Sequence, residues 1–239
     1  MQYAAAETAI IDQLKATERA LAASQALLAR MLPGFVIERL TAEPGAPITD
    51  NFAEASVLFA DISGFVGIAK RLGNEGTVAL LNRLTRAFDA LAARHGVEKI
   101  KTIGDGYMAV AGVPHPSADH CERLARLALD MRKAAARIGR QAGIAIRLHI
   151  GIASGPVTAG IIGADRLAYD VWGEAVNLAS RLEQLAAADQ ILLSPEAMEQ
   201  LSAEFVTSYR GQVEIKGLGT GEAWVLEGAA AEAGSGYLH

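Results

Sequence analysis

Three short polar segments contain residue types that bind metal ions and phosphate groups. The first, residues 59–65, has the sequence FADISGF: an apolar run ends in Asp61, and a Ser-Gly pair then turns the chain toward a helix. An Asp carboxylate is the hard oxygen ligand that Mg²⁺ takes, and a helix start offers free backbone N–H groups to phosphate oxygens. The same residues also suit a simple helix cap, so this segment alone leaves both interpretations open.

The second segment, residues 98–108, has the sequence EKIKTIGDGYM and predicts a hairpin whose turn holds Asp105 between two glycines. Turn chemistry favours Asp at such a position for structural reasons alone. If this hairpin lies beside the strand that ends at Asp61, two carboxylates meet and can hold two Mg²⁺ ions. Lys99 and Lys101 alternate along the strand, so we expect both to point to the same side.

The third segment, residues 169–181, has the sequence YDVWGEAVNLASR and predicts a strand followed by a helix. Asn177 and Arg181 are four residues apart and therefore share one helix face. An amide orients a ribose, and a guanidinium fork binds phosphate oxygens. A solvated helix face with a surface ion pair is the alternative, and it would be the better interpretation of this helix in isolation.

The N-terminal segment predicts a long helix, because residues 2–31 contain no Gly or Pro and are rich in Ala. Leu14, Leu21 and Leu28 repeat every seven residues, which is typical of a parallel coiled coil. An amphipathic helix packed against its own domain is the alternative. Pro33 and Gly34 end the helix, and a short second helix at 35–40 and a linker at 43–47 follow.

The remaining pattern predicts an α+β fold in which helices cover one face of a largely antiparallel sheet. The expected elements are strand 55–60, helix 75–95, hairpin strands 97–103 and 107–113, helix 119–141, strands 144–152, 157–162 and 169–172, helix 173–186, strand 191–193, helix 195–201 and strands 205–213 and 222–226. This order gives a ferredoxin-like βαββαβ core with a C-terminal α/β extension. The expected organisation is a helical dimerising segment and linker at 1–45, one domain at 46–228 and a disordered tail at 229–239.

Composition excludes several classes of function. The formal net charge of −5 argues against non-specific binding to nucleic acid. The single cysteine, Cys121, cannot form an intrachain disulfide, which favours a reducing compartment. No apolar run reaches the ~18–20 residues that span a bilayer, and charges throughout the first thirty residues exclude a signal peptide. We therefore expect a cytoplasmic chain without a membrane segment, free or attached to a membrane-anchored receptor.

Five segments, in the same order, resemble the signature segments of class III adenylate and guanylate cyclases. They are ITDNFAEASVLFADISGF, EKIKTIGDGYMAVAGVP, IGIASGPVTAG, YDVWGEAVNLASRLE and GQVEIKGLG. The resemblance runs from about Ile48 to Leu226 and is greatest to the homodimeric bacterial cyclases of mycobacterial type. It implies that Asp61, Asp105 and the carbonyl of Ile62 bind two Mg²⁺ or Mn²⁺ ions.

The resemblance also implies the roles of the other polar residues. Lys101 and Asp170 match the pair that reads the purine, and their donor and acceptor pattern fits adenine. Asn177 and Arg181 match the residues that hold the ribose and stabilise charge on the α-phosphate. The remaining substrate-binding positions that match are Gly64, Phe65, Val171 and, for the outer phosphates, Lys216.

The implied reaction converts ATP to 3′,5′-cyclic AMP and pyrophosphate at two sites shared by a head-to-tail homodimer. In the family, one protomer supplies the metal aspartates and the other supplies the purine, ribose and Arg residues. The sequence departs from the family pattern at Val66, where a Thr is common, and at Leu218, where a second Lys is common. Both departures weaken contacts to phosphate without removing a metal ligand.

Three alternatives remain. A guanylate cyclase is the first, and Lys101 and Asp170 speak against it, because guanylate cyclases carry Glu and a small polar residue there. The second is a catalytically inactive cyclase-like module, which usually lacks a metal Asp, the Asn or the Arg. The third is an interaction module built around the coiled coil, which does not explain why the polar residues converge.

Overall fold

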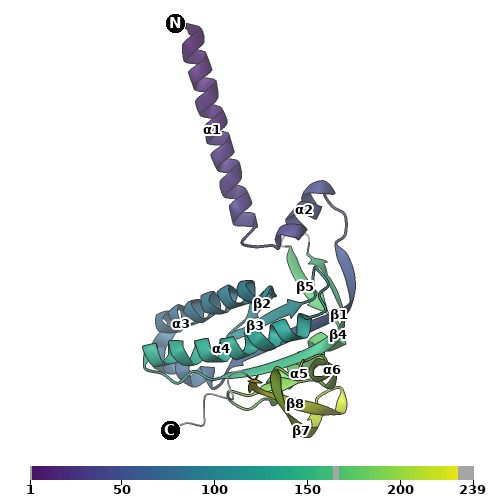
Figure 1. The fold of residues 1–239 in the computed structure, drawn as a ribbon. Helices are drawn as coiled ribbons and strands as arrows, with labels where there is room; N and C mark the ends of the chain where they lie inside the picture. Colours follow the sequence, from purple (N-terminus) through teal and green to yellow (C-terminus); the bar gives the residue numbers. More distant parts are fainter. Residues whose placement is uncertain (1, 164–166, 231–239) are drawn as a thin grey trace. The chain divides into compact units, whose positions relative to one another are not determined.

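The computed structural model describes residues 2–163 and 167–230, with side chains from residue 10 onward (Figure 1). The chain divides into two compact units, one formed by residues 1–49 and 160–169 and the other by residues 50–159 and 170–239. Residues 231–239 of the expected disordered tail lie outside the described residues. Each unit is therefore considered by itself.

The first unit contains helix α1 (Gln2–Leu28) and helix α2 (Gly34–Ala42). The apolar side chains of α1 are in solvent: Ile10, Leu14 and Leu21 are 60%, 59% and 58% exposed. In contrast, α2 buries Val36, and the ring of Phe35 meets Tyr169 edge-on at a centroid distance of 5.4 Å. In the described part of the chain, no helix has the length and apolar character needed to cross a membrane.

The second unit contains the predicted ferredoxin-like arrangement. Strand β1 (Thr49–Ile62) is followed by α3 (Phe65–His95), the hairpin β2 (Glu98–Ile103) and β3 (Gly106–Ala111), α4 (His120–Ala142) and β4 (Leu148–Ile162). These strands lie in the order β2-β3-β1-β4, which is the order that a βαββαβ unit gives. The expected α+β class and core are confirmed.

Helices α3 and α4 lie side by side over one face of this sheet (Figure 1). They bury Phe88, Leu124 and Met131 against the strand residues Leu58 and Ile150. The helix predicted to follow Ser63-Gly64 and the longer helix predicted at 75–95 form one continuous element, α3, with a kink at Gly73, where φ is 68°. Strand β4 is one 15-residue strand where the pattern predicts two.

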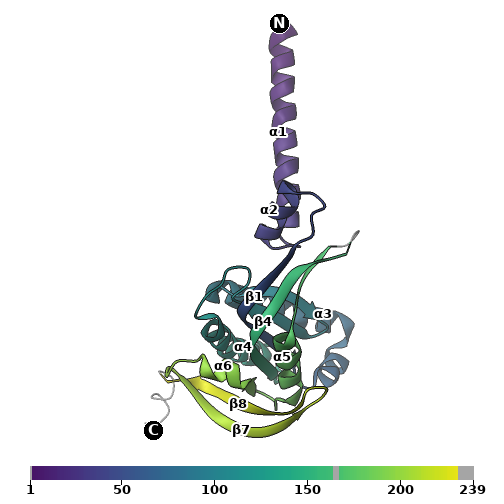
Figure 2. The same ribbon diagram turned by 90° about the vertical axis from the view of Figure 1, so that its right-hand side faces the viewer.

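The C-terminal extension continues the sheet. Strand β5 (Ala168–Trp172) pairs with β4 and leads to helix α5 (Glu174–Leu185). Strand β6 (Ile191–Leu193) runs parallel to β4, helix α6 (Pro195–Glu199) follows, and the hairpin of β7 (Phe205–Ile215) and β8 (Gly219–Ala229) completes the order β4-β6-β8-β7. Figure 2 shows α5 beside β4 and above the β7–β8 hairpin.

Gly151 fixes the position of α5 on the sheet. Its neighbours Ile150 and Ile152 belong to the core beneath α3 and α4, so the alternation of the strand turns Gly151 to the opposite face. A Cβ atom built there would lie 2.2 Å from the carbonyl oxygen of Ala179 and 2.3 Å from the nitrogen of Glu183. The backbone of α5 therefore packs directly on a residue without a side chain.

We predict that Gly151→Ala lowers the free energy of unfolding by about 2–4 kcal/mol, because the added methyl group collides with backbone that has no rotamer to change. Urea denaturation followed by circular dichroism measures this difference. Gly67→Ala is the matched control, since no atom lies within 4 Å of the position that an added Cβ would take. The control should leave stability unchanged or raise it slightly. Equal stability of the two variants would contradict the close packing of α5 on β4.

Candidate functional site

Asp61 and Asp105 lie together at one end of the sheet. Asp61 is near the end of β1, and Asp105 occupies the turn between β2 and β3. Strands β1 and β3 are antiparallel, with Ala60 opposite Tyr107, so the end of β1 meets the turn. The two carboxyl groups are in hydrogen-bonding contact, and Asp61 also accepts the N–H of Ile62 at 2.8 Å.

This contact concentrates negative charge in a half-buried place. Burial, followed by the neighbouring Asp61, raises the pKa of Asp105 from 3.8 to about 6. Two carboxylates that disfavour each other's ionisation suit a divalent cation, which removes the repulsion. The described residues contain no cluster of three or more His, Cys, Asp or Glu side chains that could hold a metal ion without other ligands. Mg²⁺ does not need one, because it takes one or two carboxylates and completes its coordination shell with water and phosphate oxygens. The residues present therefore fit Mg²⁺.

The start of α3 lies directly beyond Asp61. Gly64 precedes the helix with a φ of 67°, in the left-handed region that suits glycine, and Phe65 is the first helical residue. The N–H of Ser63 is bonded to the carbonyl of Arg147 at 2.8 Å. The next N–H groups have no acceptor within the helix, because the first turn of any helix leaves them free. Free N–H groups of this kind are able to bind an anion, and these lie beside the two aspartates.

Lys101 and Asp170 form a salt bridge between β2 and β5. Lys99 instead donates to Asp89 of α3 at 3.0 Å and lies over the ring of Tyr107. The prediction that both lysines point to the same side is wrong, because a shift of register between them breaks the alternation of the strand. Lys99 thus holds β2 against α3, and Lys101 is the lysine paired with Asp170. The side chain of Val171, the residue after Asp170, is buried, and the N–H of Val171 donates to the carboxylate of Asp170 at 2.9 Å.

Asn177 and Arg181 share a face of α5, as expected, and Lys216 is exposed in the turn between β7 and β8. Arg181 donates to Gln184 at 2.9 Å. Among the described residues, no hydrogen bond or ion pair joins these three side chains to Asp61 or Asp105, and no cationic side chain lowers the pKa of Asp105. One chain therefore keeps the carboxylate pair apart from the amide, guanidinium and Lys216.

Glu183 is a residue that the sequence analysis missed. It is two positions after Arg181, so it lies on nearly the opposite side of α5. Burial, Asp61 and Asp105 raise the pKa of Glu183 to about 7, while His149 acts in the other direction. The side of α5 that faces the aspartates of its own chain thus carries a carboxylate. The sequence feature that could have identified Glu183 is an acidic residue next to the apolar positions of a predicted helix.

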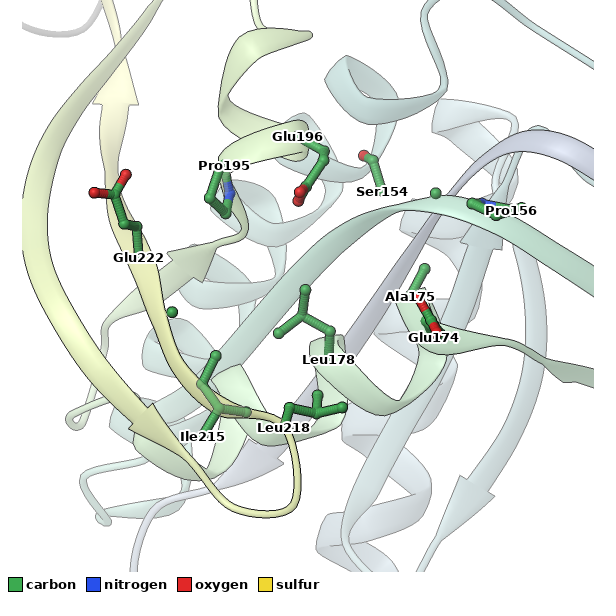
Figure 3. Close-up of a pocket in the computed structure, with 12 residues that line it drawn as sticks. Ser154, Pro156, Glu174, Ala175, Leu178, Pro195, Glu196, Ile215, Leu218 and Glu222 are labelled. Atoms are coloured by element: carbon green, nitrogen blue, oxygen red, sulfur yellow. The ribbon is translucent and has the colours of Figure 1, made fainter.

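A separate cavity of ≈ 410 Å³ lies between α5, α6 and the turn of β7 and β8 (Figure 3). Leu178, Ile215 and Leu218 form its apolar part, and Glu174, Glu196 and Glu222 stand around it. It contains none of the side chains expected to act on substrate. Three carboxylates repel a triphosphate, so this cavity is not suited to the phosphate groups of a nucleotide.

Curated proteins and solved structures that resemble this chain are cyclases. The chain is 46% identical to an adenylate cyclase of Mycobacterium tuberculosis over 215 residues, which are 90% of this chain and 48% of that protein. It therefore spans about half the length of that relative. The guanylate cyclase domain of RhGC from Catenaria anguillulae, solved with GTP, is 34% identical with a TM-score of 0.72 over 75% of this chain and 99% of that one. The adenylyl cyclase CyaB from P. aeruginosa is 27% identical with a TM-score of 0.72 over 76% and 96%.

We predict that Asp105→Asn raises the melting temperature at pH 7.5 in EDTA. The folded pKa of Asp105 exceeds its ordinary value, so between pH 3.8 and about 6 the folded state holds a proton that the unfolded chain has released. Stability therefore falls as the pH rises through this window, and the charged carboxylate is destabilising above it. The gain should shrink as the pH approaches 4.

Calorimetry at several pH values measures this effect, and Glu199→Gln, which removes an exposed carboxylate from α6, is the control that should change nothing. A lower melting temperature for Asp105→Asn at pH 7.5 would contradict the crowding of the two carboxylates.

The family profile described as the adenylate and guanylate cyclase catalytic domain matches residues 49–228. The match begins at the first residue of β1 and ends within β8, so it includes every site residue considered above. The chain belongs to the adenylate and guanylate cyclase catalytic domain family.

Proposed function

We propose that this chain is an adenylate cyclase that acts as a head-to-tail homodimer with two shared sites. The ribose 3′ oxygen of ATP attacks the α-phosphorus, and the bond from that phosphorus to the oxygen of the β-phosphate breaks. The 3′ hydroxyl proton is released, and the products are cyclic AMP and pyrophosphate. The reaction needs no covalent bond to the protein, which agrees with a site built from carboxylates, an amide and cations.

The separation of the polar residues within one chain is the observation that carries this proposal. The charge on the phosphates must be balanced near Asp61 and Asp105, yet Arg181 and Lys216 have no contact with that pair in their own chain. A second copy placed head-to-tail brings its Arg181 and Lys216 to the aspartates of the first, and two-fold symmetry then creates two equal sites.

Each residue has a distinct part in the proposed site. Asp61, Asp105 and the carbonyl of Ile62 hold two divalent cations, which supply charge for the attacking oxygen and for the departing pyrophosphate. The free N–H groups around Gly64 and Phe65 bind phosphate oxygens. Asn177 of the partner subunit orients the ribose, and the partner's Arg181 compensates charge that develops in the transition state. The partner's Lys216 binds the outer phosphates.

The salt bridge of Lys101 and Asp170 supports adenine as the base. In the described chain each of these side chains satisfies the other, so the pair is held in place before substrate arrives. An adenine between them takes a hydrogen bond from the lysine at a ring nitrogen and donates its exocyclic amine to the carboxylate. Guanine presents the opposite pattern at these atoms, with an acceptor carbonyl where adenine has a donor.

The exposed helix α1 supports a second contact between the two copies. Ile10, Leu14, Leu21, Leu28 and Met31 are all exposed, and they occupy alternating three- and four-residue steps with Thr17 and Ser24. A parallel coiled coil buries such a seam, and the polar members keep it weak. This helix would set the orientation of the two protomers.

The first test is the formation of cyclic nucleotide by the purified chain, with ATP or GTP and with Mg²⁺ or Mn²⁺. The expected result is cyclic AMP from ATP, dependent on metal, with a specific activity that rises with protein concentration because the monomer is inactive. Replacing Leu14 and Leu21 by Glu should make activity fall more steeply on dilution. A folded dimer that forms no product from either nucleotide would favour the inactive regulatory module instead.

Shared sites predict complementation between two inactive variants. Asp61→Ala and Arg181→Ala chains should each lose activity by at least about a hundredfold, because each lacks one half of both sites. In a mixture, random pairing places half of the chains in heterodimers, and each heterodimer has one intact site of two. About a quarter of the wild-type activity should therefore return after equilibration. Gel filtration verifies that dimers form. Dimers without recovered activity would rule out shared sites.

The purine pair predicts a switch of substrate. Lys101→Glu alone places a second carboxylate beside Asp170, so activity with both nucleotides should fall. Lys101→Glu with Asp170→Ser should move the ratio of kcat/KM for GTP over ATP by about a hundredfold or more toward GTP, because each unmatched polar group costs binding. Lys99→Gln is the control, since Lys99 pairs with α3, and the ratio should stay unchanged. An unchanged ratio in the double variant would exclude this pair as the purine reader.

A further inference from the structure

A cationic surface lies on the helical side of the sheet. Helices α3 and α4 are adjacent (Figure 1) and border an open cavity of ≈ 340 Å³ that we call the α3–α4 groove. It is lined by Leu91, Arg94, Asp130, Lys133, Ala134, Arg137 and Arg140. None of these residues belongs to the proposed catalytic site, and Leu91 and Ala134 give the groove an apolar floor.

Contacts between the two helices hold the groove open at a fixed width. Arg83 of α3 donates to the side chain of Gln141 in α4 near one end. His95 of α3 contacts Asp130 of α4 at 2.9 Å near the other end. The apolar residues of both helices pack on the same core beneath the groove. The two walls are thus fixed before any ligand binds, which reduces the entropy lost on binding.

The charge of the groove is positive and largely unbalanced. Its one acid, Asp130, already contacts His95 at 2.9 Å and Lys133 at 3.8 Å. In the part of the chain that the structure describes, Arg94, Arg137 and Arg140 form no ion pair with an acidic side chain. This cluster stands on a chain whose formal net charge is −5, so it is a local feature rather than a reflection of composition.

Helix stability accounts for only part of this cluster. Arg94 and Arg140 are in the last turns of α3 and α4, where a cation interacts favourably with the helix dipole. Lys133 and Arg137 are in the interior of α4, where this effect is absent. Like charges three and four residues apart on one helix face repel each other, so Arg137 lies between two cations, Lys133 and Arg140, whose repulsion a bound anion would relieve.

We propose that the α3–α4 groove binds a polyphosphate anion or the phosphate headgroups of an anionic lipid, both through the same chemistry. The row from Lys133 to Arg140 extends about 10 Å along α4, and Arg94 faces it from α3. This length matches an extended chain of phosphates or adjacent headgroups. One Arg guanidinium group can donate to two phosphate oxygens at once. A row of such groups therefore suits a ligand with several phosphates better than a ligand with a single carboxylate.

The test compares two variants that each lose three positive charges. The groove variant is Lys133→Gln, Arg137→Gln and Arg140→Gln, and the control variant is Lys15→Gln, Arg19→Gln and Arg210→Gln, all exposed in the structure. Removing a row of like charges relieves repulsion, so the groove variant should fold. Titration calorimetry with inorganic tripolyphosphate in EDTA gives the soluble arm. Sedimentation with phosphatidylcholine vesicles, with and without phosphatidic acid, gives the lipid arm.

The expected result is binding by the wild type and the control variant in at least one arm, with affinity reduced about tenfold or more in the groove variant. The arm that shows this loss identifies the source of the phosphate. Equal affinity of the groove and control variants, or no binding in either arm, would overturn the proposal. Cyclase activity of the groove variant should stay at the wild-type level, because none of its three residues belongs to the proposed catalytic site, so this outcome is independent of the proposed catalytic function.

Discussion

The pairing of β1 with β3 places two carboxylates in contact, and the rest of the site depends on that constraint. Neither Asp61 nor Asp105 is unusual in its own segment, since one follows a strand and the other occupies a glycine-flanked turn. The antiparallel register brings them together in a half-buried position and raises the pKa of Asp105 to about 6. Charge crowded in this way is unfavourable until a cation neutralises it. The fold therefore carries a cost at this end of the sheet that either a bound cation or a proton on Asp105 removes.

The alternation of side chains along β4 lets one strand form part of the core on one face of the sheet and position α5 on the other. Ile150 and Ile152 face α3 and α4 and form part of the core, whereas Gly151 faces α5. The absence of a side chain at Gly151 lets the backbone of α5 rest on the strand. Because α5 is fixed so closely, its surfaces have defined directions: Glu183 is near the aspartates of its own chain, and Asn177 and Arg181 face elsewhere. A site split in this way is well suited to assembly from two copies.

Charge is distributed unevenly over the catalytic unit. Cationic side chains gather along α3 and α4, while the cavity beside α5 and the β7–β8 turn is surrounded by carboxylates. The two surfaces have opposite preferences for ligands, and neither contains the residues of the proposed active site.

Sequence patterns alone predict the class of fold, the order of its elements and the polar segments proposed to act on substrate. The apolar residues in 119–141 predicted a helix, and the apolar run 191–193 predicted a strand, each within a residue or two of the observed bounds. These predictions succeed because the helix buries one side and the strand is buried throughout, so the pattern of apolar residues is clear. The glycines around Asp105 predicted its turn, since that local conformation depends on local residues. The resemblance of five ordered segments to cyclases agreed with the family match.

Contacts between these residues depend on how distant segments of the chain pack together. The contact of Asp61 with Asp105 depends on the register of two strands that are distant in the sequence. The separation of Lys99 from Lys101 depends on a bulge, which alternation alone cannot predict. Glu183 joins the site because α5 packs on Gly151, and the α3–α4 groove exists because two helices share a core. Each of these features is set by packing between distant segments, whereas the sequence pattern reports only the conformational preference and the buried side of each segment.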